Sequence, residues 1–481
     1  MNHGPVRLPA RSRILFPLIL LVAACAGGGA APVETTVGMV ADSTAAEETA
    51  ADSSTVVSTT EPSEDTSPST TATSAPGATQ SSRPASCEPS DGVPFRSDAS
   101  VTLEPLDNDA GLGLFAAEYP LPGPTEGLWS QWGQGIVAPT GLHYSALGDH
   151  LGADGNSYIY EYDPVSRTLT RVMDVLSLVD HQPGAWGYGK IHSQMVLDDC
   201  GSIWAFTYWG TRRDIEYGNG YEGDLLLEID PHSRAIRNHG AVVGERGVPS
   251  LIGALGGQYI VAEAVEAESD DGELYVFDTA TGEAVHQVDD PDHIGFRSLA
   301  VDSEGRVLYS VEGAQLRALD VTTGETSETG IEIPGEDDEE DPEFLRAATP
   351  VLPDGYWYGA TQESDQLFRV SADSEVEVLA DTDGYTASLA YTPEGDRIFW
   401  LPGAHGSSWE TGANVLAYDT ATGEVTEVIS LLEPFEELGL LPGGTYSITY
   451  HEESLILGVN ASTLDDDSGF GTVVLVVIEG V

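Results

Sequence analysis

Basic side chains are scarce in this chain of 481 residues, which has 19 lysines and arginines against 79 aspartates and glutamates. Lys190 is the single lysine. The formal charge of −60 argues against nucleic acid as a partner, because binding to a phosphate backbone needs a basic surface. The same charge favours solubility and a strong dependence on salt.

Several sequence signals of known chemistry are also missing. The chain has three cysteines and no Cys and His spacing of a zinc site, so no metal ligand set is predicted. It lacks a phosphate-binding loop and the Gly-x-Ser-x-Gly motif, so no cofactor is expected. Calcium stays open because the acidic run 336–341 offers oxygen ligands. That run lacks the glycine spacing of an EF-hand loop, which favours solvated charge instead.

The N-terminus has the pattern of an export signal. An apolar run at residues 14–24 follows three arginines and is too short to span a bilayer comfortably, which indicates a signal peptide over residues 1–24. The sequence Val22-Ala23-Ala24-Cys25 then resembles the lipobox of bacterial lipoproteins. That resemblance implies that Cys25 becomes the lipidated first residue after cleavage. The alternative is an ordinary signal peptide with an incidental cysteine.

A biased segment separates this signal from the rest of the chain. Residues 25–90 are rich in Ser, Thr, Ala and Glu, with few large apolar side chains. Such a segment cannot bury enough apolar surface to fold, so we expect a disordered tether there. The folded domain is expected to span residues 91–481.

One hairpin motif recurs in the folded domain. Leu274 to Phe277 reads as an apolar strand, Asp278 can cap a turn, and Gly282 can take the positive φ that closes it before the next strand. Copies are spaced by roughly 40 to 65 residues, the range of a four-stranded propeller blade with insertions. The seven copies are Tyr162-Asp163, Ile229-Asp230, Phe277-Asp278, Leu319-Asp320, Val370-Ser371, Tyr418-Asp419 and Ile478-Glu479.

This strand, Asp-x-x-Thr-Gly-Glu turn and strand unit resembles bacterial beta-propellers of the YVTN and PQQ-like repeat type, from about residue 140 to the C-terminus. The resemblance implies an all-β, seven-bladed β-propeller. The last copy, at 472–479, has no strand after it, so we expect an N-terminal strand within Ser100 to Leu106 to close blade seven. Kelch-type and sandwich folds are the alternatives.

The two remaining cysteines, Cys87 and Cys200, are an even pair in an exported protein, which predicts a disulfide. Cys200 falls in a turn between the first two strands of blade two. Cys87 falls just before the expected closing strand. Both positions belong to the same face of a propeller. Two isolated thiols are the alternative.

Candidate site residues lie at the opposite face, where loops between blades and loops joining second and third strands meet. The candidates gathered there by this rule are Lys190, His192, Arg212, Arg213, Arg297, Arg346 and Trp409, with Tyr217 and Tyr221 in the long loop of blade two. His405 lies with Trp409 in the long loop of blade six, and His143, Tyr385 and Tyr446 approach the same mouth. Guanidinium groups suit carboxylate or sulfate, and aromatic rings suit sugar faces. Alternatively, these bases neutralise neighbouring acidic loops.

Two functions remain open from the sequence. The first is an outward-facing, lipid-anchored module of the cell envelope that binds a small molecule or an anionic polysaccharide, or acts as a scaffold for a protein partner. The second is a uronate lyase, with Lys190 or His192 as base and Tyr217 or Tyr221 as acid. A structural histidine that bonds a backbone carbonyl is the alternative for His192.

Replacing Cys25 by serine tests the lipid anchor. The wild-type protein should fractionate with membranes, whereas Cys25→Ser should move to the soluble fraction, because so short an apolar run does not anchor a protein after cleavage. Immunoblotting of both fractions measures the change. Cys87→Ser, which leaves the lipobox intact, is the control. A Cys25→Ser protein that stays with membranes contradicts the lipoprotein interpretation.

Overall fold

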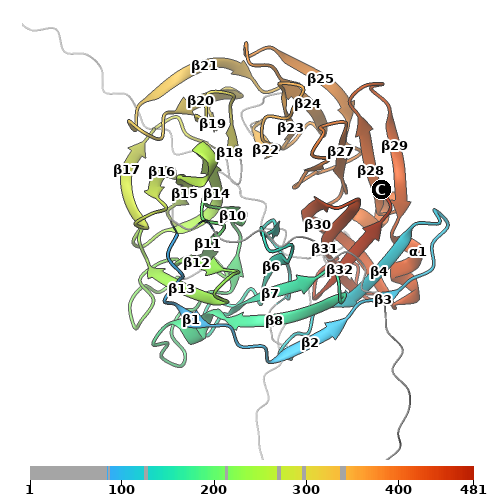
Figure 1. Cartoon of the computed structure of the whole chain (residues 1–481), viewed down its shortest axis with the longest axis horizontal. Helices are drawn as coiled ribbons and strands as arrows, with labels where there is room; N and C mark the ends of the chain where they lie inside the picture. The colour runs from blue at the N-terminus through green and yellow to red at the C-terminus, as the bar shows by residue number, and fades with distance from the viewer. Residues whose placement is uncertain are drawn as a thin grey trace, which may run out of the picture. The chain divides into compact units, whose positions relative to one another are not determined.

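The computed structural model describes residue 84 and residues 87–123, 128–211, 215–267, 272–294, 299–335 and 343–481, which belong to one compact unit. Seven antiparallel sheets are arranged in a ring (Figure 1). The chain is a seven-bladed β-propeller. The predicted all-β fold is confirmed. Cys25, the predicted signal peptide and most of the predicted tether lie outside the described residues.

The first three blades are given from the innermost strand outward. Blade 1 contains β5 (Ile136–Val137), β6 (His143–Gly148), β7 (Ser157–Asp163) and β8 (Thr168–Asp174). Blade 2 contains β9 (Lys190–Ile191) with β10 (Val196–Leu197), then β11 (Ile203–Tyr208), β12 (Leu226–Asp230) and β13 (Ala235–Gly240). Blade 3 contains β14 (Gly247–Ala254), β15 (Tyr259–Val265), β16 (Gly272–Asp278) and β17 (Glu283–Asp289).

The next three blades follow the same order. Blade 4 contains β18 (Leu299–Val301), β19 (Val307–Val311), β20 (Gln315–Leu319) and β21 (Thr326–Glu332). Blade 5 contains β22 (Leu345–Ala348), β23 (Trp357–Thr361), β24 (Gln366–Val370) and β25 (Val376–Asp381). Blade 6 contains β26 (Ala390–Tyr391), β27 (Arg397–Trp400), β28 (Asn414–Asp419) and β29 (Val425–Ser430).

Helical segments are short and lie in the connections. They are η1 (Val175–Leu178), η2 (Leu255–Gly257), η3 (Ser408–Thr411) and α1 (Leu432–Glu437). In the described part of the chain, no helix has the length and apolar character needed to cross a membrane.

The repeated turn forms as the sequence predicts. In the hairpin between β16 and β17, the Asp278 carboxylate accepts a hydrogen bond from the Ala280 N–H at 2.8 Å. The Gly282 N–H donates to the Asp278 carbonyl at 2.8 Å, and Gly282 has a φ of 71°, which favours glycine. Equivalent turns follow Asp320 and Asp419. One local motif therefore sets the register of several outer hairpins.

Burial differs between strands in a way that follows from stacking the blades. The second strands β11, β19 and β23 are buried at every position, because neighbouring blades cover both faces. The outer strand β17 is mostly exposed. Large rings such as Trp204, Tyr309 and Trp400 fill the spaces between blades.

Blade 7 is closed by an N-terminal strand, as predicted, although the strand is a different one. It contains β30 (Leu440–His451), β31 (Ser454–Thr463), β32 (Thr472–Glu479) and β4 (Gly113–Glu118), with the edge strand β3 (Glu104–Pro105) outside β4. β4 pairs along β32 from Gly113 opposite Glu479 to Glu118 opposite Val474.

The predicted closing segment, Ser100 to Leu106, is therefore wrong. Its first part belongs to β2 (Ala99–Thr102), which pairs with β8 of blade 1. Its second part contains Pro105, which has no N–H for a central ladder. In β4, by contrast, buried side chains alternate with more exposed ones, as in a strand with one face on the core, and β4 pairs with the apolar strand β32.

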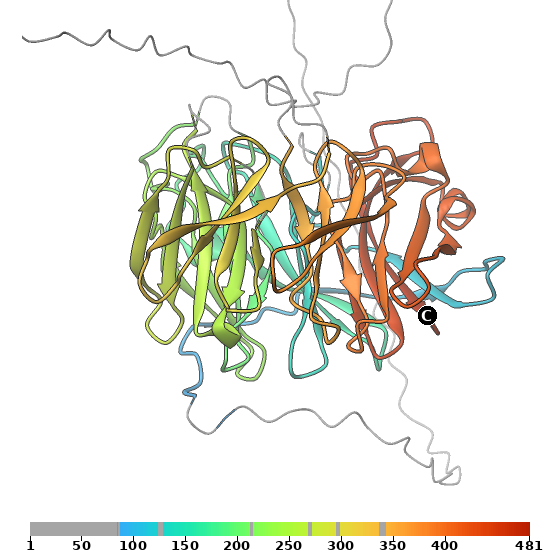
Figure 2. The same cartoon turned by 90° about the horizontal axis from the view of Figure 1, so that it is seen from above.

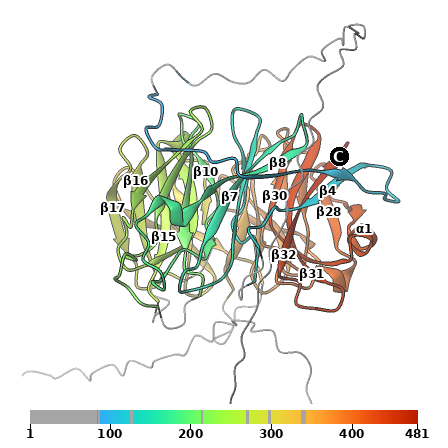
Figure 3. The ribbon, with the colours of Figure 1, turned by 90° about the horizontal axis from the view of Figure 1, so that it is seen from below.

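The N-terminal segment thus runs along three blades. β1 (Val93–Pro94) pairs with β13 of blade 2, β2 pairs with β8 of blade 1, and β4 completes blade 7. Figures 1 to 3 show this blue segment along the outside of the ring. We call β1 to β4 the strap. It covers the outer edges of blades 1 and 2.

A disulfide fixes the start of the strap. Cys87 and Cys200 are bonded with their Cα atoms 5.7 Å apart, which confirms the predicted pair. Cys200 lies in the turn between β10 and β11 of blade 2. The Ser90 N–H also donates to the Asp230 carboxylate at 2.9 Å. Cys87 to Ser90, the last residues of the predicted tether, are thus attached to blade 2.

Removing the disulfide should destabilise the propeller. The double variant Cys87→Ser/Cys200→Ser should lose about 2–5 kcal/mol of unfolding free energy, because the bond closes a long loop in the unfolded chain. Denaturant titration under non-reducing conditions measures the loss. A reductant should lower wild-type stability by a similar amount and leave the variant unchanged. Equal stability of variant and wild type would show that strand pairing alone holds the strap.

Candidate functional site

An indole ring is at the centre of an aromatic cluster at one end of the propeller. Trp132 lies in the segment between β4 of blade 7 and β5 of blade 1. Its ring centroid lies 4.6–5.9 Å from five other rings, those of His150, His192, His405, Tyr446 and Phe470. We call these six residues, together with Lys190 and Tyr385, the Trp132 cluster.

Topology explains why residues so far apart in the sequence meet. His150 follows β6, His405 follows β27, and Phe470 precedes β32, so all three lie in loops between the second and third strands of their blades. Lys190 lies in β9, at the start of the innermost strand of blade 2. These positions share one end of a propeller, the end that the sequence rule selected.

Lys190 is held against two aromatic rings of the cluster. Its Nζ lies 4.9 Å from the Trp132 centroid and 6.0 Å from the Tyr208 centroid. β9 pairs with β11 so that Lys190 is opposite Tyr208. The ring quadrupoles attract the ammonium group and stabilise it in this partly buried position.

Arg346 brings a second cation to the cluster. It lies on β22 of blade 5 and is 1% exposed. Its Nε donates a hydrogen bond to the Tyr385 hydroxyl. Its guanidinium carbon lies 5.2 Å from the Tyr385 centroid and 5.7 Å from the Tyr446 centroid. Tyr446 contacts Trp132 in turn, so Arg346 is joined to the indole through one ring.

The surroundings of Arg346 differ from those of other arginines. Its Nη2 is buried and has no hydrogen-bond partner among the described residues. It is also the one buried arginine in the described part of the chain. By contrast, eight arginines pair with carboxylates, namely Arg167, Arg171, Arg234, Arg237, Arg246, Arg306, Arg317 and Arg369.

The alternative that the candidate bases neutralise acidic loops therefore does not describe Arg346, the one candidate arginine among the described residues. A buried cation is costly unless hydrogen bonds and opposite charge compensate it. Tyr385 and Tyr446 compensate in part, through one hydrogen bond and two ring faces. The remaining N–H groups of Arg346 suit an anion that enters the cluster.

His192 has the contacts of a structural residue. It is 2% exposed, and its Nδ1 lies 3.1 Å from the Pro249 carbonyl oxygen. Its ring is stacked on Trp132 at an interplanar angle of 5° and lies 4.7 Å from the Tyr208 centroid. This is the backbone-bonded histidine that the sequence left open as the alternative to a catalytic base.

Tyr217 and Tyr221 belong to another group of side chains. Tyr221 is fully buried between Tyr188 and Tyr217, at centroid distances of 5.2 and 5.7 Å. Its hydroxyl donates to the Asp224 carboxyl at 3.3 Å. Burial, followed by the nearby Asp224 carboxyl, raises the pKa of Tyr221 well above its ordinary value. In the part of the chain that the structure describes, neither tyrosine has a ring contact or hydrogen bond with His192.

The other predicted site residues are placed as follows. Arg212, Arg213, Arg297 and the acidic run 336–341 lie outside the described residues. Trp409 lies in η3, is half-buried, and makes no ring contact with the Trp132 cluster in the part of the chain described. The cluster and the adjoining Arg346 therefore bring together six predicted residues, namely Lys190, His192, Arg346, Tyr385, His405 and Tyr446. The prediction for His143 is wrong, because this residue is buried at the start of β6, whereas the end of β6 that leads to His150 faces the cluster.

Sequence reasoning did not select Trp132, His150 or Phe470. Trp132 precedes the first repeat, so no strand pattern placed it at the mouth. Phe470 lies in the β31–β32 loop, and His150 in the β6–β7 loop, both of which belong to the loop class that the rule names. Searching every such loop for rings, rather than for bases, would have found these two.

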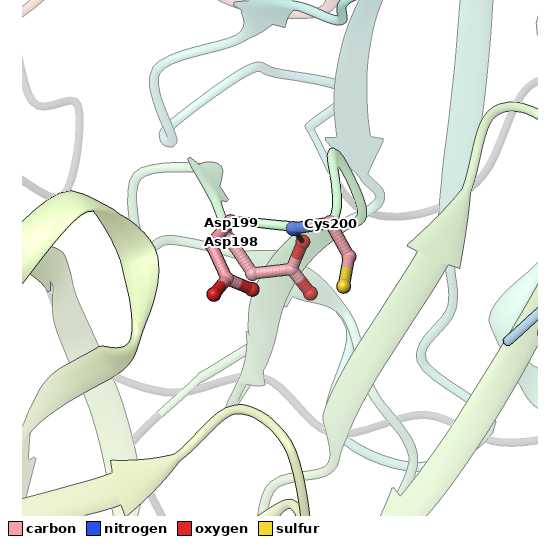
Figure 4. A group of neighbouring side chains, drawn as sticks. All are labelled: Asp198, Asp199 and Cys200. Carbon is pink, nitrogen blue, oxygen red and sulfur yellow. Dashed lines mark hydrogen bonds between the residues drawn. The ribbon is translucent and has the colours of Figure 1, made fainter. Parts of the chain in front are cut away.

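A second group of side chains, near the disulfide, has the residue types of a metal site. Asp198, Asp199 and Cys200 lie side by side in the β10–β11 turn (Figure 4). The Cys200 sulfur is bonded to Cys87. Asp198 accepts hydrogen bonds from the Cys200 and Ser202 N–H groups and from the Trp204 indole at 2.8–2.9 Å. These contacts give the turn a structural role.

Comparisons with known proteins add little to this geometry. No protein-family model and no curated protein matches the chain. The fold is similar to a catalytically inactive virginiamycin B lyase from Staphylococcus aureus with quinupristin, at a TM-score of 0.48 and 9% identity, over 76% of this chain and 99% of that chain. It is also similar to a chain of the mitotic checkpoint complex, at a TM-score of 0.45 and 11% identity, over 84% and 97%. Neither similarity bears on function.

The Asp224 site predicts a pH dependence of stability. Asp224 is fully buried, and burial raises its pKa to about 8. The unfolded carboxyl ionises near pH 4, so the native state binds the extra proton between about pH 4 and 8. This contribution to stability is fully present below pH 4 and is lost as pH rises towards 8, by up to about 1.4 kcal/mol per pH unit.

Asp224→Asn should reduce that slope. The unfolding free energy of wild type and variant is measured by denaturant titration at pH 5 and pH 8, and the difference between the two pH values is compared. The comparison within each protein is insensitive to a general loss of stability in the variant. An unchanged difference would mean that Asp224 is ionised in the folded protein.

Proposed function

We propose that the chain is a ligand-binding module of the cell envelope, anchored by a lipid on Cys25, and that the Trp132 cluster with Arg346 binds an anionic carbohydrate. The observation that carries this proposal is the buried Arg346 guanidinium, which has no carboxylate partner among the described residues. The β-propeller fold is compatible with a binding or scaffold module.

The chemistry of the two cations supports a carboxylate or sulfate as the recognised group. A guanidinium forms two parallel hydrogen bonds with such groups, and an ammonium adds a point charge. The chain carries a formal charge of −60, which repels long polyanions. At physiological salt this repulsion acts within about 8 Å. A short acidic oligosaccharide brings fewer charges within that distance of the acidic surface than a long polyanion does, so it fits the site better.

Aromatic rings at the surface of the cluster support a sugar ligand. Both His192 and Phe470 are stacked parallel to Trp132, at interplanar angles of 5° and 10°. The Trp132 indole is therefore packed against other rings of the cluster and has a structural role. His405 is exposed, and Tyr385 and Phe470 are half-buried, so these three rings are the ones available to a sugar face.

The lyase alternative has less support. Its candidate base His192 is buried and bonded to a backbone carbonyl, and its candidate acids Tyr217 and Tyr221 belong to another group of side chains. A base and an acid within reach of one substrate carbon are required for elimination. We therefore favour binding without turnover.

The proposal is tested by binding of trigalacturonate to the purified protein, with maltotriose as the neutral probe. Trigalacturonate should raise the melting temperature, because it binds the native state. Arg346→Met should weaken binding at least about tenfold, since a charge-assisted hydrogen bond contributes about 1.5–3 kcal/mol. The same variant should be as stable as wild type or more stable, because it removes a buried charge.

Arg369→Met is the matched control. Arg369 lies in the same blade, over the Tyr356 ring at 4.3 Å, but pairs with Glu377 at 2.6 Å. Its loss should leave binding unchanged and lower stability slightly. Absence of a melting shift with both trigalacturonate and a sulfated trisaccharide, or full binding by Arg346→Met, would contradict the proposal. A rise of ultraviolet absorbance from an unsaturated product would favour the lyase.

A further inference from the structure

Titratable imidazoles gather at the proposed binding site. Among the described residues, three histidines contact Trp132, and they come from blades 1, 2 and 6. His192 is buried and bonded to a carbonyl. His150 is half-buried and His405 is exposed. They lie in the β6–β7 loop of blade 1 and the β27–β28 loop of blade 6. An imidazole ordinarily titrates near pH 6.5, within the physiological range.

His150 is connected to Trp132 by a hydroxyl that can serve either protonation state. The Trp132 indole N–H donates to Ser130 Oγ at 2.6 Å, and Ser130 Oγ lies 2.7 Å from His150 Nε2. With a neutral ring, the hydroxyl donates to Nε2. With a protonated ring, Nε2 donates to Oγ, and the hydroxyl hydrogen turns to the Leu128 carbonyl at 3.4 Å. The network therefore accepts a proton without losing its indole contact.

His405 is bordered by aromatic rings. It is exposed, stacked on Tyr385 at 5.1 Å, and in edge contact with Trp132 at 5.6 Å and Tyr446 at 6.1 Å. Aromatic rings attract an imidazolium, whereas Arg346, which lies against the same Tyr385 and Tyr446 rings as His405, repels it. A bound anion between the two cations would remove that repulsion. Protonation of His405 and anion binding therefore favour one another.

The charges of Lys190 and Arg346 oppose protonation of the two imidazoles, whereas a buried carboxyl beside His150 changes its charge in the same direction as they do. Asp149 precedes His150 and accepts hydrogen bonds from the Leu151 and Asn156 N–H groups, each at 3.0 Å. Burial raises the pKa of Asp149 to about 6. Loss of its charge on acidification also makes the site more positive.

We propose that His150 and His405 make the Trp132 cluster an acid-strengthened anion site, which binds acidic oligosaccharides more tightly as pH falls and releases them towards neutrality. This inference rests on the proposed function. By linkage, the factor by which protonation raises affinity equals the factor by which the ligand favours protonation.

The test measures affinity for trigalacturonate by calorimetry from pH 8 to pH 5. Its carboxylates stay ionised in this range, and a sulfated trisaccharide is the second probe. Affinity of the wild-type protein should rise about tenfold or more on acidification, within the range typical of coupled equilibria. The double variant His150→Gln/His405→Gln should lose most of the rise, measured as the ratio of its own affinities at pH 5 and pH 8. That ratio is insensitive to a general loss of affinity from the two missing rings.

His286→Gln is the control. His286 lies on β17 of blade 3, where its Nε2 lies 3.1 Å from the Thr322 carbonyl oxygen. It should keep the full pH profile. Binding that does not vary with pH would overturn the acid-strengthened site and leave the proposed function standing. A full profile in the double variant would overturn it too, and would assign the titration to Asp149. Binding at no pH would contradict the proposed function itself.

Discussion

The ladder between β4 and β32 is the constraint on which the rest of the structure depends. β32 is apolar and buried along most of its length, and it ends two residues before the C-terminus. Without β4 its hydrogen-bonding edge would stay unpaired, and blades 7 and 1 would be joined by side-chain packing without the β-ladder that the N-terminal segment supplies. Trp132 lies in the segment that directly follows this ladder, so the centre of the candidate site depends on the same closure.

The candidate site has two cations, although the chain as a whole is strongly negative. The chain as a whole repels anions, yet Lys190 and Arg346 are held by aromatic rings at one end of the propeller. Rings can hold a cation without neutralising it, whereas a carboxylate would occupy the groups that an anionic ligand needs. Arg346 therefore keeps N–H groups for an anionic ligand, whereas the carboxylate-paired arginines of this acidic protein do not.

Much of the fold follows from local sequence, because a turn such as that at Asp278 needs only neighbouring residues. The number of blades and the disulfide followed from counting these turns and the cysteines. The closing strand was misplaced because its register is set by β32, more than 350 residues away, and not by local pattern. Likewise, the sequence cannot show that Tyr221 bonds Asp224 or that Trp132 lies under His150. Those contacts depend on how blades are stacked.

Blade 2 links the two ends of the molecule. β11 has six residues, about 20 Å of extended chain. At one end, the turn before β11 carries Cys200 and is bonded to Cys87. At the other, Tyr208 pairs with Lys190 in the Trp132 cluster. The covalent attachment of the strap is therefore separated from the candidate site by the length of a strand. The disulfide can therefore hold the start of the strap without contacting the loops that carry the candidate site.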